Sequence, residues 1–409
     1  MPARPNGTRI PPATLRVGTM LNLLKNAEVY APEPLGRRHL LVGAGKLLWI
    51  GEHSPALDDS LRVEVFDLEG QRVVPGIIDA HAHITGGGGE SGYSSRIPPV
   101  PLHRFTRAGV TTVVGLLGTD DVTRNTASVL AGARGLCEEG LSAYCYTGGY
   151  HVPPITLTGN VCSDIVHIDR IIGVGEIAIS DHRSGQPTLD ELLRIASDAH
   201  VAGMMTGKAG IVHLHLGDGE RGLELVRQAL EKSEIPARVF NPTHVNRRRE
   251  LFDEALEIAD RGCTVDVTAY PVREGDEGWS AEEAIARYLD SGLPPERITV
   301  SSDGGGCLPV FDDEGTLLHM DIGSPGILAD KLGKLLERGL ALESILPAFT
   351  SNPARLLRLH DKGTIAVGAD ADLVVLGENA SIRHVMAGGR WHVLDGEVMI
   401  KATIQEPKD

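Results

Sequence analysis

Residues 73–83 read VVPGIIDAHAH, a short apolar run that ends in two histidines separated by one residue. An apolar run of this length, bounded by turn residues, is typical of a buried strand. Side chains two positions apart in a strand lie on the same face, so His81 and His83 should point the same way. The stretch therefore predicts a buried strand that places two imidazoles together at its carboxyl end.

Similar apolar runs follow along the chain and alternate with amphipathic helical stretches. There are eight runs in all, the other seven at residues 109–118, 141–149, 171–180, 209–218, 237–245, 263–270 and 298–306. Typical intervening helices are expected at residues 189–200, 221–233 and 250–260, where apolar residues recur three and four apart. Eight strand–helix units over about residues 70–360 predict an α/β fold, the TIM (β/α)8 barrel, whose active sites lie at the carboxyl ends of the strands.

The two ends of the chain have a different texture from the middle. Residues 20–52 and residues 363 onward contain short β-type runs broken by tight turns. Neither end is long enough to bury a core by itself, so we expect one small β-sandwich domain built from both. The predicted division is residues 1–70 plus 361–409 for this domain and residues 71–360 for the barrel.

Composition excludes several classes of protein. The net charge of −16 repels polyanions, so we do not expect the protein to bind nucleic acid. No stretch approaches the roughly 18 consecutive apolar residues of a membrane span, and residues 1–18 lack the apolar core of a secretory signal. Five cysteines without a CxxC pair argue against a disulfide framework. We therefore expect a cytoplasmic protein with reduced thiols and no membrane partner.

Unusual polar residues occur at the ends of the predicted strands. They are His81 and His83 on the first strand, Glu176 on the fourth, His213 and His215 on the fifth, His244 on the sixth and Asp303 on the eighth. A single histidine at such a position is more often a hydrogen-bonded core residue, but this many converging by chance is improbable. Neutral imidazole and carboxylate are the ligands of catalytic Zn²⁺ and its neighbours, which keep one position open for water. The pattern predicts a metal centre that makes hydroxide available near pH 7.

Two assignments within this set have alternatives. Only one of His213 and His215 need be a metal ligand, and His215 is favoured because it lies next to the exit loop. His213 would then either contact a metal ligand or pack in the core. Asp303 would either bind the metal only, or also carry the proton from the attacking water to the leaving amine.

Six motifs in chain order carry a family resemblance. PGIIDAHAH, HAHITGGGGESG, TGGYHVPP, ISDHRS, PTHVNR and SDGGG together resemble the isoaspartyl dipeptidases of the amidohydrolase superfamily, across nearly the whole chain. The resemblance implies two zinc ions in the barrel, a small β-domain from both termini, and a homo-oligomer. It implies that His81, His83 and Asp303 hold the first ion, that His215 and His244 hold the second, and that Tyr150 polarises the scissile carbonyl.

The sequence departs from this family at two positions. The family bridges its metals with a carboxylated lysine on the fourth strand, where this chain has Glu176, the expected bridge. The shorter glutamate would require a closer strand or an altered centre, and a buried glutamate–arginine pair is the structural alternative. Cys307 stands where the family has a substrate-binding serine, and it would either shift substrate preference or merely fill a loop.

The expected substrate explains the remaining motif residues. An isoaspartyl dipeptide has a free α-ammonium and two carboxylates, so its site needs one anion and two cations. By resemblance, Glu90 binds the ammonium and Arg183 and Arg247 bind the carboxylates, for which arginine's planar fork is suited. The glycine run that contains Gly88 allows the backbone to approach the ligand closely.

The leading hypothesis is metal-dependent hydrolysis of β-aspartyl dipeptides by a metal-activated water. One alternative is a related amidohydrolase that acts on another acidic amide, such as an N-acyl amino acid, a cyclic imide or an isoaspartyl-containing peptide. A second alternative is a scaffold of the same fold without catalysis.

Overall fold

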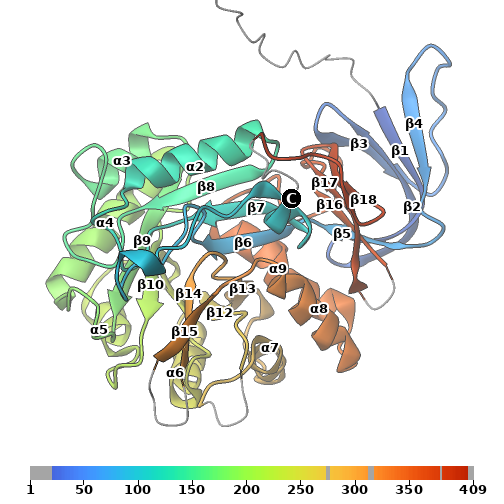
Figure 1. Ribbon diagram of the computed structural model, residues 1–409. Coiled ribbons are helices and arrows are strands. Elements are labelled where there is room, and N and C mark those ends of the chain that lie inside the picture. Colours follow the sequence, from blue (N-terminus) through green and yellow to red (C-terminus); the bar gives the residue numbers. More distant parts are fainter. Residues whose placement is uncertain (1–20, 273–276, 312–316, 378–379, 404–409) are drawn as a thin grey trace, which may run out of the picture.

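The computed structural model describes residues 21–272, 277–311, 317–377 and 380–403 (Figure 1). Its centre is a curled sheet of parallel strands in chain order, with helices on its outer side, as the alternating pattern predicted. These strands are β6 (Ile77–Ala82), β7 (Val110–Gly115), β8 (Ser142–Thr147), β9 (Ile171–Ile179), β10 (Val212–Leu216), β11 (Phe240–Thr243), β12 (Val265–Thr268) and β13 (Ile298–Ser301). Each of the eight predicted runs contains one of them.

The strands form two hydrogen-bonded groups that meet at both ends. One group runs from β6 to β11 and the other pairs β12 with β13. At one junction, His83 N donates to Gly304 O over 2.8 Å and Asp303 N donates to His81 O over 3.2 Å. At the other junction, Val245 N lies 3.4 Å from Asp266 O. The carboxyl ends of the first and last parallel strands are therefore neighbours.

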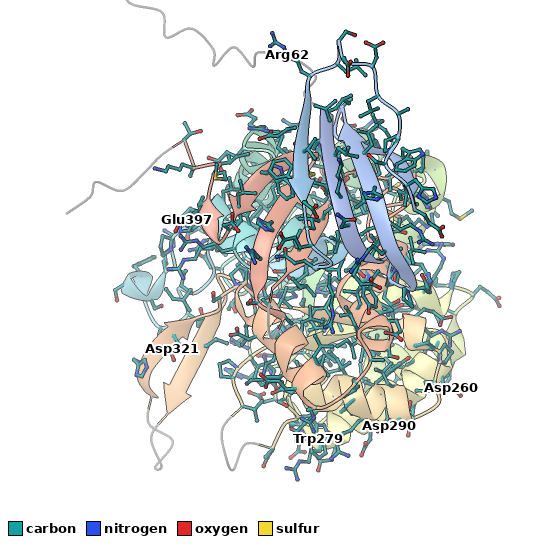
Figure 2. The ribbon with its side chains drawn as sticks, turned by 90° about the vertical axis from the view of Figure 1, so that its right-hand side faces the viewer. Arg62, Asp260, Trp279, Asp290, Asp321 and Glu397 are labelled. Atoms are coloured by element: carbon teal, nitrogen blue, oxygen red, sulfur yellow. The ribbon has the colours of Figure 1, made fainter. Side chains whose placement is uncertain are left out.

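Helices cover the outer side of these strands (Figure 1). They are α1 (Leu102–Thr106), α2 (Thr126–Glu138), α3 (Val161–His167), α4 (Leu189–Thr206), α5 (Glu224–Lys232), α6 (Arg249–Asp260), α7 (Ala281–Asp290), α8 (Ile327–Glu337), α9 (Leu342–Phe349) and α10 (Ser351–Leu356), with 3-10 turns at Tyr93–Ser95, Ala237–Val239 and Pro295–Arg297. Figure 2 shows Asp260 and Asp290, the last residues of α6 and α7, at the end of the molecule away from Arg62. Apolar faces of these helices and strands share one large core.

Local sequence signals explain where α4 begins and ends. The Thr188 hydroxyl accepts from the backbone N of Glu191, and the Glu191 carboxylate accepts from the backbone N of Thr188, which together form a capping box at the first turn. The helix was predicted to end near residue 200, yet it continues to Thr206, because Gly207 with a φ of 74° is the first residue to leave the helical conformation.

Strands from both ends of the chain join in a second sheet. Its nine strands are β1 (Leu21–Tyr30), β2 (Pro34–Gly43), β3 (Lys46–Gly51), β4 (Val63–Asp67), β5 (Arg72–Pro75), β16 (Leu373–Leu376), β17 (Ile382–Ala387), β18 (Arg390–Leu394) and β19 (Glu397–Val398). β5 pairs with β1 on one side and with β16 on the other, which joins the two ends of the chain. A separate apolar cluster that includes Leu24, Leu40 and Met386 fills this sheet's inner face.

A hairpin follows β13. It consists of β14 (Cys307–Phe311) and β15 (Leu317–Ile322), which pair antiparallel. Among the described residues, no helix is both long and apolar enough to cross a membrane.

Candidate active site

The six predicted metal ligands converge at the carboxyl ends of the parallel strands. His81 and His83 end β6, Glu176 lies within β9, His215 lies in β10, His244 follows β11 and Asp303 follows β13. Five of the six are buried, and the Asp303 side chain is 15% exposed. The β-strand alternation and the meeting of β6 with β13 bring these positions together.

One group of ligand atoms comes from the two neighbouring strand ends. Asp303 Oδ1 lies 3.1 Å from His83 Nε2 and 3.4 Å from His81 Nε2. The ligand atoms of these three residues all lie within 4.8 Å of one another, which is a spacing suited to a metal ion. They are the residues that the sequence assigned to the first metal.

The second group surrounds Glu176. Its Oε2 lies 3.1 Å from His215 Nδ1, 3.5 Å from His244 Nε2 and 3.7 Å from His81 Nε2. Its Oε1 lies 3.7 Å from His83 Nε2. Oε1 therefore faces His83 of the first group, while Oε2 faces the second group and also His81. The ligand atoms of His81, Glu176 and His244 also lie within 4.8 Å of one another.

The residues present fit a divalent metal. His81 Nε2 and Asp303 Oδ1 are buried, and within the described part of the chain neither makes a hydrogen bond. Buried polar atoms are normally paired, because leaving them unpaired is costly. Two adjacent acceptors without donors, surrounded by imidazole nitrogens and carboxylate oxygens, are the donor set that first-row metals prefer.

Electrostatics favour a cation at the same place. Burial alone would raise the pKa of Glu176, but the charges of His81 and His215 hold the pKa of its carboxyl well below the ordinary value. Burial likewise opposes a charge on His81, yet Glu176 and Asp303 raise the pKa of His81 to about 9. Burial lowers the pKa of His244 well below its usual range, so this imidazole keeps a free lone pair.

Two of these residues have unusual backbone conformations. His244 has a φ of 61° and Asp303 a φ of 51°, in the left-handed region that residues other than glycine seldom adopt. Such conformations are concentrated at functional sites, where the surrounding structure holds them in place. Here they turn the side chains at the ends of β11 and β13 toward the centre.

Tyr150 and Arg183 lie beside the metal-ligand cluster. The Tyr150 hydroxyl is 2.8 Å from His215 Nδ1, and the ring is buried. The Arg183 guanidinium lies 5.6 Å from the centre of that ring, and its Nη1 is 3.6 Å from Glu90 Oε1. Burial, together with the charge of Glu176, raises the pKa of Tyr150 well above its ordinary value, so the hydroxyl keeps its proton.

The other predicted substrate residues border the same region. Arg247 Nη1 lies 3.5 Å from Asp218 Oδ1, whose side chain is exposed. A Cβ placed on Gly88, whose φ is 70°, would lie 3.6 Å from Cys307 Sγ. Burial raises the pKa of the Cys307 thiol to about 11, which keeps it a neutral thiol near pH 7.

Asp181 is a residue of the site that sequence analysis did not identify. Its Oδ2 accepts from His215 Nε2 over 3.0 Å and from Arg183 Nη2 over 2.7 Å, while its Oδ1 accepts from Arg183 Nε over 3.0 Å. It therefore joins an expected metal ligand to an expected substrate cation. The only signal in the sequence was its position at the end of a strand, immediately before the residues HRS.

The loop at residues 118–125 also contributes positions that the sequence did not single out. Asp121 accepts from the backbone N of His151 over 3.2 Å and contacts His151 Nδ1 at 2.9 Å. Arg124 donates to Gly88 O over 3.2 Å and to Ile97 O over 3.0 Å. This single loop thus contacts both the segment that carries Tyr150 and the glycine segment.

Comparison with known proteins identifies the family of the chain. The sequence pattern of the amidohydrolase family matches residues 72–392. The crystal structure of a beta-aspartyl dipeptidase from Fervidobacterium islandicum AW-1, in complex with beta-Asp-Leu dipeptide, is 45% identical, with a TM-score of 0.87 over 93% of this chain and 98% of that chain.

More distant relatives share the fold. A D-hydantoinase structure is 19% identical, with a TM-score of 0.66 over 93% of this chain and 97% of that chain. Adenine deaminase 2 from Rhizobium meliloti (strain 1021) is 26% identical over 83% of this chain and 51% of its own length, so the chain spans about half of this curated relative. Because the family pattern covers most of the residues, the chain belongs to the amidohydrolase family of hydrolytic enzymes.

Proposed function

We propose that the protein hydrolyses β-aspartyl (isoaspartyl) dipeptides in a metal-dependent reaction that uses a metal-activated water. Glu176 is the main support, because its two oxygens face two groups of imidazoles at the carboxyl ends of the strands. The similarity to a dipeptidase solved with beta-Asp-Leu extends over nearly the whole chain and supports the substrate class.

The residues that would hold metal are those of the two groups. His81, His83 and Asp303 would hold one Zn²⁺, and His215 and His244 would hold a second, with Glu176 between them. When bound, such ions make a water nucleophilic at neutral pH and polarise the substrate carbonyl.

The chain's own residues would supply binding and proton transfer. Tyr150, which keeps its proton, donates a hydrogen bond to the scissile carbonyl oxygen as charge develops there. Asp303 accepts the proton from the attacking water and passes it to the nitrogen of the leaving amine, so the amide becomes a carboxylate and an amine.

Glu90 and Arg183 would bind the aspartyl end of the substrate. Glu90 pairs with the free α-ammonium, and Arg183 offers Nη1 to the α-carboxylate while Asp181 holds its Nε and Nη2. Arg247 would bind the terminal carboxylate, and Gly88 and Cys307, which lie close to each other, would also contact the substrate.

We also propose the architecture that goes with this function. The parallel strands and their helices form a closed (β/α)8 barrel domain over residues 71–360, apart from β5 (Arg72–Pro75), which pairs with β1 and β16 in the second sheet. Residues 1–70 and 361–409 form the small β-sandwich domain, although residues 1–20 and 404–409 lie outside the described part. Homo-oligomeric assembly and a cytoplasmic location remain predictions.

A paired substrate assay tests the function. Purified protein, with its metal content measured, is incubated with β-Asp-Leu or α-Asp-Leu, and the free amine released is quantified with and without a chelator. We expect chelator-sensitive release from the β-isomer. Release from the α-isomer alone, or from neither isomer by protein that contains zinc, would contradict the proposal.

Cys307 favours one second candidate, a related activity on another acidic amide. A thiol is a weaker hydrogen-bond partner than the hydroxyl that the resemblance leads one to expect there. N-acyl amino acids, cyclic imides and isoaspartyl-containing peptides form the comparison panel, and faster turnover of any of these than of β-Asp-Leu would favour the second candidate.

A further inference from the structure

We propose that His213, Asn241 and the backbone carbonyl of Thr264 form a buried chain that fixes the proton of His81 on Nδ1. His213 is then a positioning residue rather than a metal ligand. This inference rests on the proposed metal-dependent function.

The three contacts of this chain are short, and the two that involve imidazole rings are fully buried. His81 Nδ1 lies 2.8 Å from His213 Nε2, and His213 Nδ1 lies 2.6 Å from Asn241 Oδ1. Asn241 Nδ2 donates to Thr264 O over 2.7 Å. The side chains of His81, His213 and Asn241 have no exposed surface, so water cannot take the place of any partner.

The direction of each hydrogen bond follows from the Thr264 carbonyl, which is the last group of this hydrogen-bonded series. A carbonyl oxygen only accepts, so Thr264 requires the NH₂ group of Asn241 to face it. The Asn241 oxygen therefore faces His213 and accepts from Nδ1–H. A neutral His213 with its proton on Nδ1 offers a lone pair at Nε2, which accepts from His81 Nδ1–H.

The consequence appears at the other nitrogen of His81. With the proton on Nδ1, the Nε2 lone pair is free, and Nε2 is the buried atom that makes no hydrogen bond in the described structure. It faces Asp303 Oδ1 at 3.4 Å and Glu176 Oε2 at 3.7 Å. When a metal ion takes the place of a proton at Nε2, this hydrogen-bonded chain leaves His81 in the one neutral tautomer that can bind a metal at that place.

Packing also keeps His213 out of the ligand set. Both of its ring nitrogens are occupied, one by His81 and the other by Asn241. The Tyr146 ring stacks on it with centroids 5.2 Å apart and an interplanar angle of 23°. A Cβ on Gly175 would lie 2.8 Å from His213 Cβ, so only glycine fits at that position of β9. The imidazole is therefore held from several sides.

Two substitutions at position 213 separate hydrogen bonding from packing. His213→Gln keeps an acceptor near the place of Nε2, whereas His213→Leu removes it. We measure the Zn²⁺ dissociation constant of each apoprotein by competition with a chromophoric chelator, and the Tm of each apoprotein. His213→Leu should bind Zn²⁺ about 10- to 100-fold more weakly than wild type, as is usual for the loss of a group that orients a ligand, and His213→Gln should stay within about threefold of wild type.

Two further variants make the test independent of folding defects. Asn241→Leu removes the next group of the hydrogen-bonded chain and should also weaken Zn²⁺ binding. This variant tests the inference if His213→Leu does not fold. His392→Leu removes another buried histidine, on β18 in the second sheet, and should leave Zn²⁺ affinity unchanged.

The outcomes are distinct. Equal Zn²⁺ affinity in wild type, His213→Leu and Asn241→Leu would overturn the inference, as would equally weak binding by His213→Gln and His213→Leu. In either case the wild-type protein would still bind zinc, so the proposed function would stand. A wild-type protein that binds no zinc would overturn both.

Discussion

Glu176 faces the imidazoles of four histidines. In these surroundings we expect the negative charge of Glu176 to contribute more to metal binding than the length of its side chain does. Glu176→Gln keeps the side-chain length but removes the negative charge between the two groups. Because this residue contacts the proposed ions directly, we expect its loss to weaken zinc binding and kcat/KM by at least about 100-fold, the upper end for groups that only orient ligands. Zinc content after dialysis and turnover of β-Asp-Leu measure this. Half-buried Glu224→Gln, in α5, is the control. Full zinc content with normal turnover in Glu176→Gln would exclude Glu176 as the bridge.

The two substrate arginines should respond differently to substitution. Within the described part of the chain, Arg247 forms an ion pair only with the exposed Asp218, so Arg247→Met should raise KM about 10- to 100-fold with little change in kcat. Arg183 also pairs with Asp181, which contacts His215, so Arg183→Met should raise KM and lower kcat as well. Steady-state kinetics on β-Asp-Leu separate the two patterns, with exposed Arg221→Met as the control. Identical kinetic effects at positions 183 and 247 would contradict the coupling through Asp181.

For individual residues, the sequence predicted which positions belong to the site better than it predicted their side-chain contacts. His81, His83 and Asp303 were chosen because they end strands, and the alternation of strand side chains does bring them together. Asp181 was missed, because its role depends on how β9 and β10 approach each other, and spacing along one strand carries no information about that. The predicted alternative of a glutamate–arginine pair is not what surrounds Glu176, since among the described residues its ion pairs are all to histidines.

Among the connecting elements, the loop at residues 118–125 contacts both sides of the site. Asp121 holds the backbone and the ring of His151, next to Tyr150, so Asp121→Ala should let the Tyr150 segment move. We expect kcat to fall about 10-fold, in line with the loss of a hydrogen bond that involves a charged group, while zinc content stays normal. Exposed Asp169→Ala provides the control. Loss of zinc together with activity would show instead that the loop supports the metal cluster.

The end of α4 depends on one glycine. Gly207 has a φ of 74°, so Gly207→Ala should destabilise the fold by about 1 kcal/mol even though nothing lies within 4 Å of the added Cβ. Gly135 in α2 also has free space around it but a helical backbone, so Gly135→Ala should stabilise by about 0.5–1 kcal/mol. Urea unfolding of both variants measures the two free energies. If both substitutions changed the free energy of unfolding in the same direction, the role assigned to backbone conformation would be contradicted.

Elements were predictable to the extent that their signals are local. All eight apolar runs contain strands, because continuous apolar runs between turns are required where both faces of a strand are covered. The start of α5 was placed at residue 221, but the helix begins at Glu224, with residues 221–223 in a turn. The contacts of Ser180 with Gly219 and Gly222 hold that turn, and they join segments about 40 positions apart that no local pattern reports.

For the whole molecule, His392 gives a pH-dependent link between the second sheet and the parallel strands. It lies on β18 beside Gly140, which precedes β8. Burial, helped by the charge of Arg390, lowers the pKa of His392 to about 4, below the ordinary 6.5. The unfolded chain therefore binds a proton more readily than the folded one, and stability is lost as the pH falls from about 6.5 toward 4.

Replacing His392 should remove this part of the pH dependence. His392→Leu should lose less stability than wild type between pH 7 and pH 5, by an amount of order 1–2 kcal/mol, since one pKa unit corresponds to about 1.4 kcal/mol. Urea unfolding at both pH values measures the difference, and exposed His182→Leu is the control. An identical loss in wild type and His392→Leu would contradict the assignment.

The junction of β6 with β13 has a consequence for the newborn chain. Asp79 beneath His81 accepts from Ser302 beside Asp303, across 223 positions of sequence. During synthesis at about 5–20 residues per second, the first histidines leave the ribosome long before their aspartate partner exists. The proposed zinc ions could therefore be held by the full ligand set only after the last parallel strand has emerged, and a chain whose translation stops before that strand would carry the histidines without the complete proposed site.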